Sequence, residues 1–232
     1  MKKIGFIGAY DKADLILYVA KMLTSMGNSV LIIDATAAQK TKYIVPVINP
    51  TTTYFTEFED IDVAVGFDSM KGMLEYLGHG ENVELDYDYV LIDVDSDYSF
   101  DSFSMQNANS NYFVTSFDVY SLKKGLEALG SLLMKVKMHK VIFSRFMSKQ
   151  ENEYLDFLSK DYNVEWENEV IYFPLEQGDQ TVIIDNQRAS KIKTKFLSAQ
   201  FKQSLMMIAS QISGNTNFVE LKKILKNMDK GV

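Results

Sequence analysis

The sequence contains no cysteine, only two histidines, and few glycines and prolines. Without cysteine the chain cannot form a disulfide, a thiol nucleophile, an iron–sulfur cluster or a zinc site with sulfur ligands. His79 and His139 are too few for a histidine-rich metal site. No stretch approaches the ~18 consecutive apolar residues of a membrane-spanning helix, and the first apolar run is interrupted too early for a signal peptide. We therefore expect a cytoplasmic protein.

Size and charge narrow the class further. The 232 residues are 47% hydrophobic and 24% charged, which is typical of a globular protein with a substantial core. The 12 glycines and three prolines argue against long flexible linkers. A net charge of −7 disfavours nucleic acid as a partner. The composition predicts one large domain with at most a small appendage.

The order of apolar runs predicts alternating strands and helices. Residues 3–8 are typical of a strand, 15–26 of a helix and 30–33 of a second strand, which together form a βαβ unit. Later helices are expected at 68–77, 119–135, 150–162 and 189–212, and strands at 44–48, 87–93, 112–115, 140–143 and 169–174. This alternation predicts an α/β fold, a doubly wound and mostly parallel sheet flanked by helices.

The turn after the first strand has parts of a phosphate-binding loop. Such a loop needs glycines around the phosphates, a lysine, and a hydroxyl that binds Mg²⁺. Here Gly8 and Lys12 are present, but Ala13 stands where the hydroxyl is needed. Asp11 and Asp14 place negative charge beside any polyphosphate, which is unfavourable at short range.

Several segments together resemble the ParA/MinD family of P-loop ATPases, including its TadZ/CpaE branch. The similar segments are the loop, helix and strand at 8–23 and 26–35, the acidic strand at 87–93, the helix and strand at 111–129 and 140–145, and the tripeptide at 172–174. The resemblance covers residues 2 to about 212. It implies a P-loop NTPase fold that takes ATP or ADP with Mg²⁺.

The resemblance also assigns site residues. It implies that the phosphates lie against Gly8, Ala9, Tyr10, Asp11, Lys12 and Ala13. It places Asp34 near the attacking water and Asp93 as the residue that holds Mg²⁺ through water. It places Ser144, Arg145 and Pro174 near the nucleotide base. The reading that needs no ligand is that Asp34 and Asp93 are helix caps or hydrogen-bonded strand ends.

The chain departs from this family in its loop. Aligned backward from Asp34, the loop is two residues shorter, and Ala9 falls where the signature lysine is expected. Ser144 replaces the base-reading asparagine, and Val94 and Asp95 follow Asp93 in place of a Thr-Pro pair. We therefore predict a non-hydrolysing protein in which ATP or ADP binding is weak or absent, with Mg²⁺ only if nucleotide binds.

Two alternatives stay open. The chain could be an active ATPase with an atypical loop. It could also carry a dinucleotide-binding unit with Asp34 on a ribose hydroxyl, but Tyr10 and Ala13 stand where that fingerprint needs glycines. The predicted role is a bacterial scaffold or positioning protein for a secretion or pilus apparatus, or for plasmid or septum placement. The expected partners are a second copy of the chain and the proteins of a membrane-associated machine.

The C-terminal segment is expected to form a separate helix. We predict a main domain at 1–212, a hinge at 213–217 and a basic amphipathic helix at 218–232. Its apolar residues recur at spacings of three and four: Phe218, Leu221, Ile224, Leu225 and Met228. This pattern is typical of a helix at a membrane surface or on a partner. It equally fits a helix docked on its own domain, so peripheral membrane contact through 218–230 and internal docking are both open.

Overall fold

The computed structural model describes residues 1–47, 52–78, 85–146 and 149–229. The strands are β1 (Lys2–Ile7), β2 (Val30–Asp34), β3 (Tyr54–Phe58), β4 (Ile61–Val65), β5 (Tyr89–Val94), β6 (Ser110–Ser116), β7 (Val136–Ser144) and β8 (Val164–Pro174). The helices are α1 (Ala13–Thr24), α2 (Thr41–Ile44), α3 (Met70–Tyr76), α4 (Asp97–Ser102), the 3₁₀ turn η1 (Met105–Asn107), α5 (Val119–Glu127), α6 (Lys149–Leu158), α7 (Gln177–Ala189), α8 (Ala199–Ser213) and α9 (Phe218–Met228).

The strands form one eight-stranded sheet in the order β3-β4-β2-β5-β1-β6-β7-β8. All neighbours are parallel except β3, which runs antiparallel to β4 at one edge. The adjacent strands β2 and β5 place Asp34 directly beside Asp93. Because β1 pairs with the other side of β5, its C-terminal end opens at the same edge of the sheet. The topology therefore brings the first loop and both acidic strand ends together.

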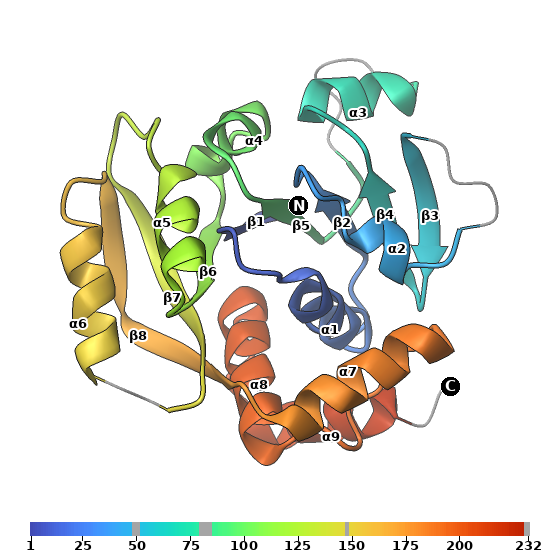
Figure 1. The fold of residues 1–232 in the computed structure, drawn as a ribbon. Helices are drawn as coiled ribbons and strands as arrows, with labels where there is room; N and C mark the ends of the chain where they lie inside the picture. The colour runs from blue at the N-terminus through green and yellow to red at the C-terminus, as the bar shows by residue number, and fades with distance from the viewer. Residues whose placement is uncertain (48–51, 79–84, 147–148, 230–232) are drawn as a thin grey trace.

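Helices cover both faces of the sheet (Figure 1). One face packs against α1, α8 and α9, with α7 beside them, and the other against α3, α4, α5 and α6. The central strands are apolar on both faces because both are covered, and β2 is buried throughout. The arrangement confirms the predicted doubly wound, mostly parallel α/β fold.

Two local predictions were wrong, and one pair of strands was not predicted. The apolar segment predicted as a strand at 44–48 instead ends helix α2 at Ile44 and continues without a strand, and its residue 48 lies outside the described residues. Residues 54–65 form a hairpin whose two turn residues, Glu59 and Asp60, have positive φ, as its tight turn requires. Helix α5 ends at Glu127 rather than 135, because the following N–H groups bond three residues back and tighten into turns.

The long helix predicted at 189–212 begins ten residues too early, because α8 starts at Ala199, and helix α7 before it was not predicted. Ser190 adopts a left-handed conformation with φ 49° and ends α7. Ser198 begins α8 by accepting a hydrogen bond from the Phe201 N–H at 3.1 Å. Asp179 near the start of α7 accepts bonds from the Ser198 N–H and hydroxyl at 2.6 and 2.8 Å, which ties the two helices together.

The C-terminal helix docks on the domain. Leu221, Ile224, Leu225 and Met228 are all buried in the core that contains α1 and α8. Asn217 accepts hydrogen bonds from the Val219 and Glu220 N–H groups at 3.2 and 3.3 Å and so caps α9. Of the two alternatives for this helix, the structure has the docked one, so these apolar side chains are not available to a membrane in this arrangement. No helix in the described part of the chain is both long and apolar enough to cross a bilayer.

Candidate functional site

The loop between β1 and α1 is held tightly against the sheet. Gly8 has φ +132°, and a Cβ there would lie 2.3 Å from the carbonyl oxygen of Val114 on β6. Only glycine tolerates both this conformation and this approach. The loop is therefore fixed where it turns into α1, and it delivers Lys12 to the position just before the first residue of that helix.

Lys12 turns inward and pairs with Asp93. Its Nζ lies 2.6 Å from Asp93 Oδ1 and donates a 2.7 Å hydrogen bond to the Gly8 carbonyl oxygen. Lys12 is 3% exposed and Asp93 is 4% exposed, so the pair is screened very little by water. The lysine expected to meet phosphate thus contacts the carboxylate expected to hold Mg²⁺.

Asp93 sits in an electrostatically difficult place. Burial raises its pKa to about 7; the Lys12 ammonium opposes this rise, and the nearby carboxylates of Asp34 and Asp95 add to it. A buried carboxylate without a cation would be strongly destabilising near neutral pH. The Lys12 ammonium is therefore the charge that makes an ionised Asp93 tolerable in this position.

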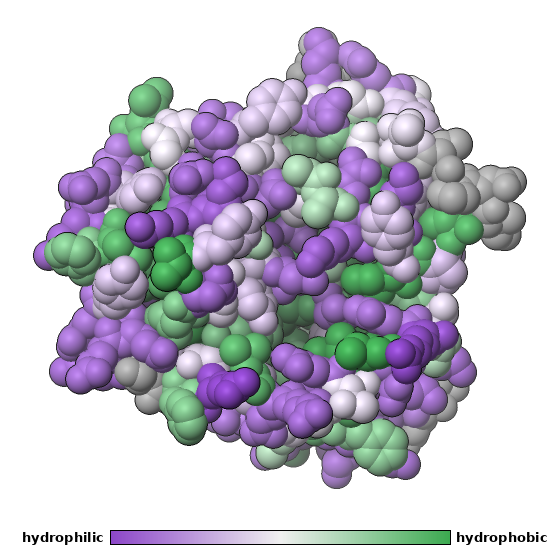
Figure 2. Space-filling view, in the orientation of Figure 1, coloured by the Kyte–Doolittle hydropathy of each residue, from purple (hydrophilic) through white to green (hydrophobic). Residues whose placement is uncertain are grey.

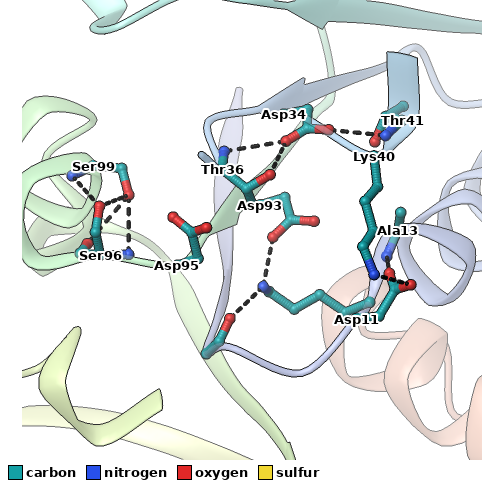
Figure 3. Close-up of polar contacts among 12 residues, drawn as sticks. Asp11, Ala13, Asp34, Thr36, Lys40, Thr41, Asp93, Asp95, Ser96 and Ser99 are labelled. Atoms are coloured by element: carbon teal, nitrogen blue, oxygen red, sulfur yellow. Dashed lines mark hydrogen bonds and ion pairs between the residues drawn. The ribbon is translucent and has the colours of Figure 1, made fainter. Parts of the chain in front are cut away.

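Asp34 organises the segment that follows β2 (Figure 3). Its Oδ1 accepts bonds from the Thr36 N–H at 3.1 Å and hydroxyl at 2.6 Å, and its Oδ2 accepts one from the Thr41 N–H at 3.0 Å. Asp95 accepts a bond from the Ala37 N–H at 3.0 Å. The side chains of Asp34 and Asp95 thus hold the loop before α2; of these, Asp34 is a hydrogen-bonded strand end, as the reading without a ligand predicts for it.

A second ion pair crosses the front of the loop. Lys40 Nζ lies 2.7 Å from Asp11 Oδ2, and both side chains are about half exposed. Asp11 Oδ1 also accepts a long 3.4 Å bond from the Ala13 N–H. A carboxylate therefore faces the helix N-terminus, which is the position that favours a phosphate in other P-loop proteins.

A small pocket remains beneath this ion pair. Its volume is about 50 Å³, and it is lined by residues 8–12 together with Thr36, Ala38, Lys40, Asp93 and Asp95. Small-molecule sites typically have about 300–1,000 Å³. With the loop packed in this way, the pocket is several times smaller than such a site. Among the described residues, no three His, Asp or Glu side chains come together as a metal site.

The residues predicted near a nucleotide base line two neighbouring cavities, one of which shares Tyr10 and Asp11 with this pocket. Ser144 and Arg145 line a cavity of about 280 Å³ that also reaches Pro174. Pro174 and Tyr10 line a different cavity of about 260 Å³ beside α7. Tyr10 stacks on Phe143 with ring centroids 4.7 Å apart. These two cavities stand beside the loop, and Pro174 belongs to both.

The structure therefore places the predicted residues in the loop pocket and in two cavities beside it. Residues 8–12 and Asp93 line a single pocket, with Asp34 close enough to raise the pKa of Asp93. Sequence reasoning missed Thr36, Lys40 and Asp95 in this neighbourhood. The available signals were the positive charge of Lys40 and the hydroxyl group of Thr36, both of which follow soon after the acidic end of β2.

Comparison with solved structures gives the same fold. MinD in the MinC:MinD cell division complex of Aquifex aeolicus aligns with a TM-score of 0.59 at 13% identity, covering 93% of this chain and 97% of that one. A putative plasmid partition protein of Borrelia burgdorferi bound to AMPPNP gives 0.53 at 12%, covering 91% and 98%. The Cyanothece McdA(D38A)–ATP complex gives 0.58 at 11%, covering 94% and 98%.

The sequence comparisons found nothing further. No protein-family model matches the chain, and no curated protein matches it. The likeness in structure spans nearly the whole length of each chain. The chain has the P-loop NTPase fold of the ParA and MinD ATPases.

Proposed function

We propose that this chain is a non-hydrolysing scaffold or positioning protein in which an internal ion pair closes the phosphate loop. The observation that carries the proposal is the 2.6 Å contact between Lys12 and Asp93. In this arrangement the lysine ammonium stands beside the carboxylate on which the resemblance would place hydrated Mg²⁺. The cation of a metal–nucleotide complex would then be replaced by a cation of the protein itself.

Two further features support a loop that does not turn over ATP. Ala13 offers no hydroxyl to a metal ion, and it is 3% exposed at the start of α1. Asp11 and Asp14 lie at the same helix end, where they take up the favourable field that would otherwise attract a phosphate. Nucleotide would have to displace Lys12 from Asp93 and open the Lys40–Asp11 pair.

A calorimetric titration with ATP and with ADP, with and without Mg²⁺, tests nucleotide binding, and a phosphate-release assay tests turnover. We expect no release above the blank from the wild-type chain, and no change in Lys12→Met. Lys40→Met, which breaks only the exposed pair, is the matched control. Phosphate release by the wild-type chain that Lys12→Met abolishes and Lys40→Met retains would instead establish the alternative, an active ATPase with an atypical loop.

The proposal includes association with a second copy of the chain over the same edge of the sheet. Tyr98, Val119 and Tyr120 are 66%, 63% and 69% exposed at the starts of α4 and α5, directly after the strands that end at this edge. Exposed apolar side chains of this size are typical of contact surfaces. Light scattering should show a dimer that Tyr120→Glu weakens; Tyr154→Glu on α6 is the control. A monomer at all concentrations would contradict this part.

The proposed cellular role and partners are inferred from the neighbours in structure. The neighbours in structure include a cell division complex and a plasmid partition protein. They support a positioning role for this chain, with proteins of a membrane-associated secretion or pilus machine, or of plasmid or septum placement, as partners. A fluorescent fusion expressed in its native cell should form discrete foci at a pole or division site. A uniform cytoplasmic signal would contradict the role.

A further inference from the structure

A second concave site lies between the last two helices, away from the phosphate loop. It has a volume of about 260 Å³. Met206 of α8 and Leu225 of α9 form its apolar floor. Lys202 of α8 and Lys222 and Lys226 of α9 stand around it. We call this site the α8–α9 groove.

The lysines of the groove are not neutralised by acidic neighbours. Lys222 and Lys226 are exposed and one turn apart on α9, an arrangement of like charges that destabilises a helix. Neither makes an ion pair with any described residue, and Lys202 donates instead to the carbonyl oxygen of Lys195 at 2.9 Å. The chain as a whole carries a net charge of −7, so this groove runs against its general charge.

The one carboxylate in the groove is already engaged. Asp229 accepts hydrogen bonds from the N–H groups of Thr194 and Lys195, both at 2.7 Å. It therefore holds the segment before α8 in place instead of pairing with the lysines. Three ammonium groups around an apolar floor are left to face solvent.

We propose that the α8–α9 groove binds an acidic segment of a partner protein. An apolar side chain of that segment would rest on Met206 and Leu225, and its carboxylates would meet Lys202, Lys222 and Lys226 at the rim. An amphipathic helix in a hydrophobic groove is a common recognition mode, and complementary charge at the rim sets its partner and orientation. This inference goes beyond the proposed function and does not depend on the state of the phosphate loop.

The shape of the groove separates this partner from other anionic ones. A duplex presents phosphates but no side chain to fill an apolar floor. A membrane surface needs apolar side chains that protrude from the protein, whereas the apolar face of α9 is buried against the domain. A protein segment supplies both carboxylates and an apolar side chain to a concave site.

The probe is a phage-displayed library of random helical peptides, selected on the full-length chain. The recovered peptides are then measured by fluorescence anisotropy. We expect enrichment of Asp and Glu together with one or two Leu, Ile or Phe. Lys222→Glu/Lys226→Glu should weaken binding on the order of tenfold, because each reversed rim charge replaces an attraction by a repulsion. Both positions are exposed, so the variant should keep its fold, which circular dichroism checks.

The matched control reverses two exposed lysines on the far α6 side, Lys149→Glu/Lys160→Glu, and should leave binding unchanged. Replacing the apolar residues of a recovered peptide by Ser should also weaken it. Selected peptides without acidic residues, or equal losses in both double variants, would overturn the proposal. So would tight binding to phosphatidylglycerol vesicles or duplex DNA that is lost in Lys222→Glu/Lys226→Glu, in the absence of peptide binding.

Discussion

Replacing Lys12 by methionine removes the cation but keeps most of the side-chain volume. Lys12 and Asp93 are both nearly fully buried, and their atoms lie 2.6 Å apart. Removing one partner of a buried pair typically costs about 3–5 kcal/mol, because the other charge is left in a medium of low dielectric. The Gly8 carbonyl oxygen also loses a hydrogen-bond donor. We therefore expect Lys12→Met to lower the free energy of unfolding by about 3–5 kcal/mol at pH 9, where Asp93, with a pKa of about 7, is ionised in the wild-type chain.

The loss should shrink at lower pH. Above its pKa of about 7, the wild-type Asp93 carboxyl ionises beside Lys12, whereas without Lys12 it must keep its proton, and this costs about 1.4 kcal/mol for each pH unit above 7. At pH 7 the deficit should be clearly smaller than at pH 9. Urea unfolding followed by circular dichroism, at both pH values, measures the difference.

The double variant separates the pair from the packing. Lys12→Met/Asp93→Leu replaces both charges by apolar groups, so it should recover most of the stability that Lys12→Met loses. A single variant within about 1 kcal/mol of the wild-type chain would refute a buried ion pair at this position. A double variant that loses the sum of the two single losses would refute the coupling between Lys12 and Asp93.

Three further predictions concern the fold. Leu221→Ala should lower the free energy of unfolding by about 2–5 kcal/mol in a denaturant titration, because this side chain on the buried face of α9 is 0% exposed. A near-neutral result would mean that α9 is not docked. The pKa values of Asp93 and Asp14 are about 7 and about 6 in the folded chain, above the ordinary 3.8. Between pH 4 and 7 the folded chain therefore binds more protons than the unfolded chain, so these two groups should make the free energy of unfolding fall as pH rises through that window. Asp14→Asn should make this fall less steep, and an unchanged slope would contradict the prediction. Gly8→Ala should destabilise by about 2 kcal/mol more than Gly27→Ala, because both glycines have positive φ but only Gly8 of the two has a backbone atom 2.3 Å from the added Cβ. Equal melting temperatures would contradict the close approach.

Much of the fold could be predicted because its central strands are apolar on both faces. The apolar segments that form β1, β2 and β5 are short, continuous and bounded by polar turns, and this pattern predicts buried strands. The register places the acidic ends of β2 and β5 side by side, with Asp34 beside Asp93. The parallel order follows from the helical connections between the strands.

The remaining errors have physical causes. Strand β3 is at the sheet edge and partly exposed, so it lacks a continuous apolar run, and the apolar run of the buried strand β4 is short and interrupted by Asp62. The break between α7 and α8 depends on a left-handed Ser190, which is not a strong sequence signal. The apolar stripe of α9 is the same whether it meets a membrane or its own domain, so only the tertiary packing on α1 and α8 could decide between them.

The contacts of the site were the least predictable part. Lys12 was expected at a phosphate, and its pairing with Asp93 depends on the path of a shortened loop, which residue spacing does not determine. Lys40 comes from a connecting segment without periodicity, yet it lies 2.7 Å from Asp11 across the pocket. Figure 2 shows hydrophilic side chains predominating on this face with separate apolar patches between them, a surface pattern that arises only when distant loops are brought together.

The most direct test of the central claim is single-turnover measurement of phosphate release from radiolabelled ATP with Mg²⁺, at protein concentrations well above that of the nucleotide. The account predicts no release above the blank from the wild-type chain, because Lys12 is held by Asp93 and the pocket has only about 50 Å³. Release that depends on both Mg²⁺ and Lys12, with Lys40→Met as the control, would contradict it.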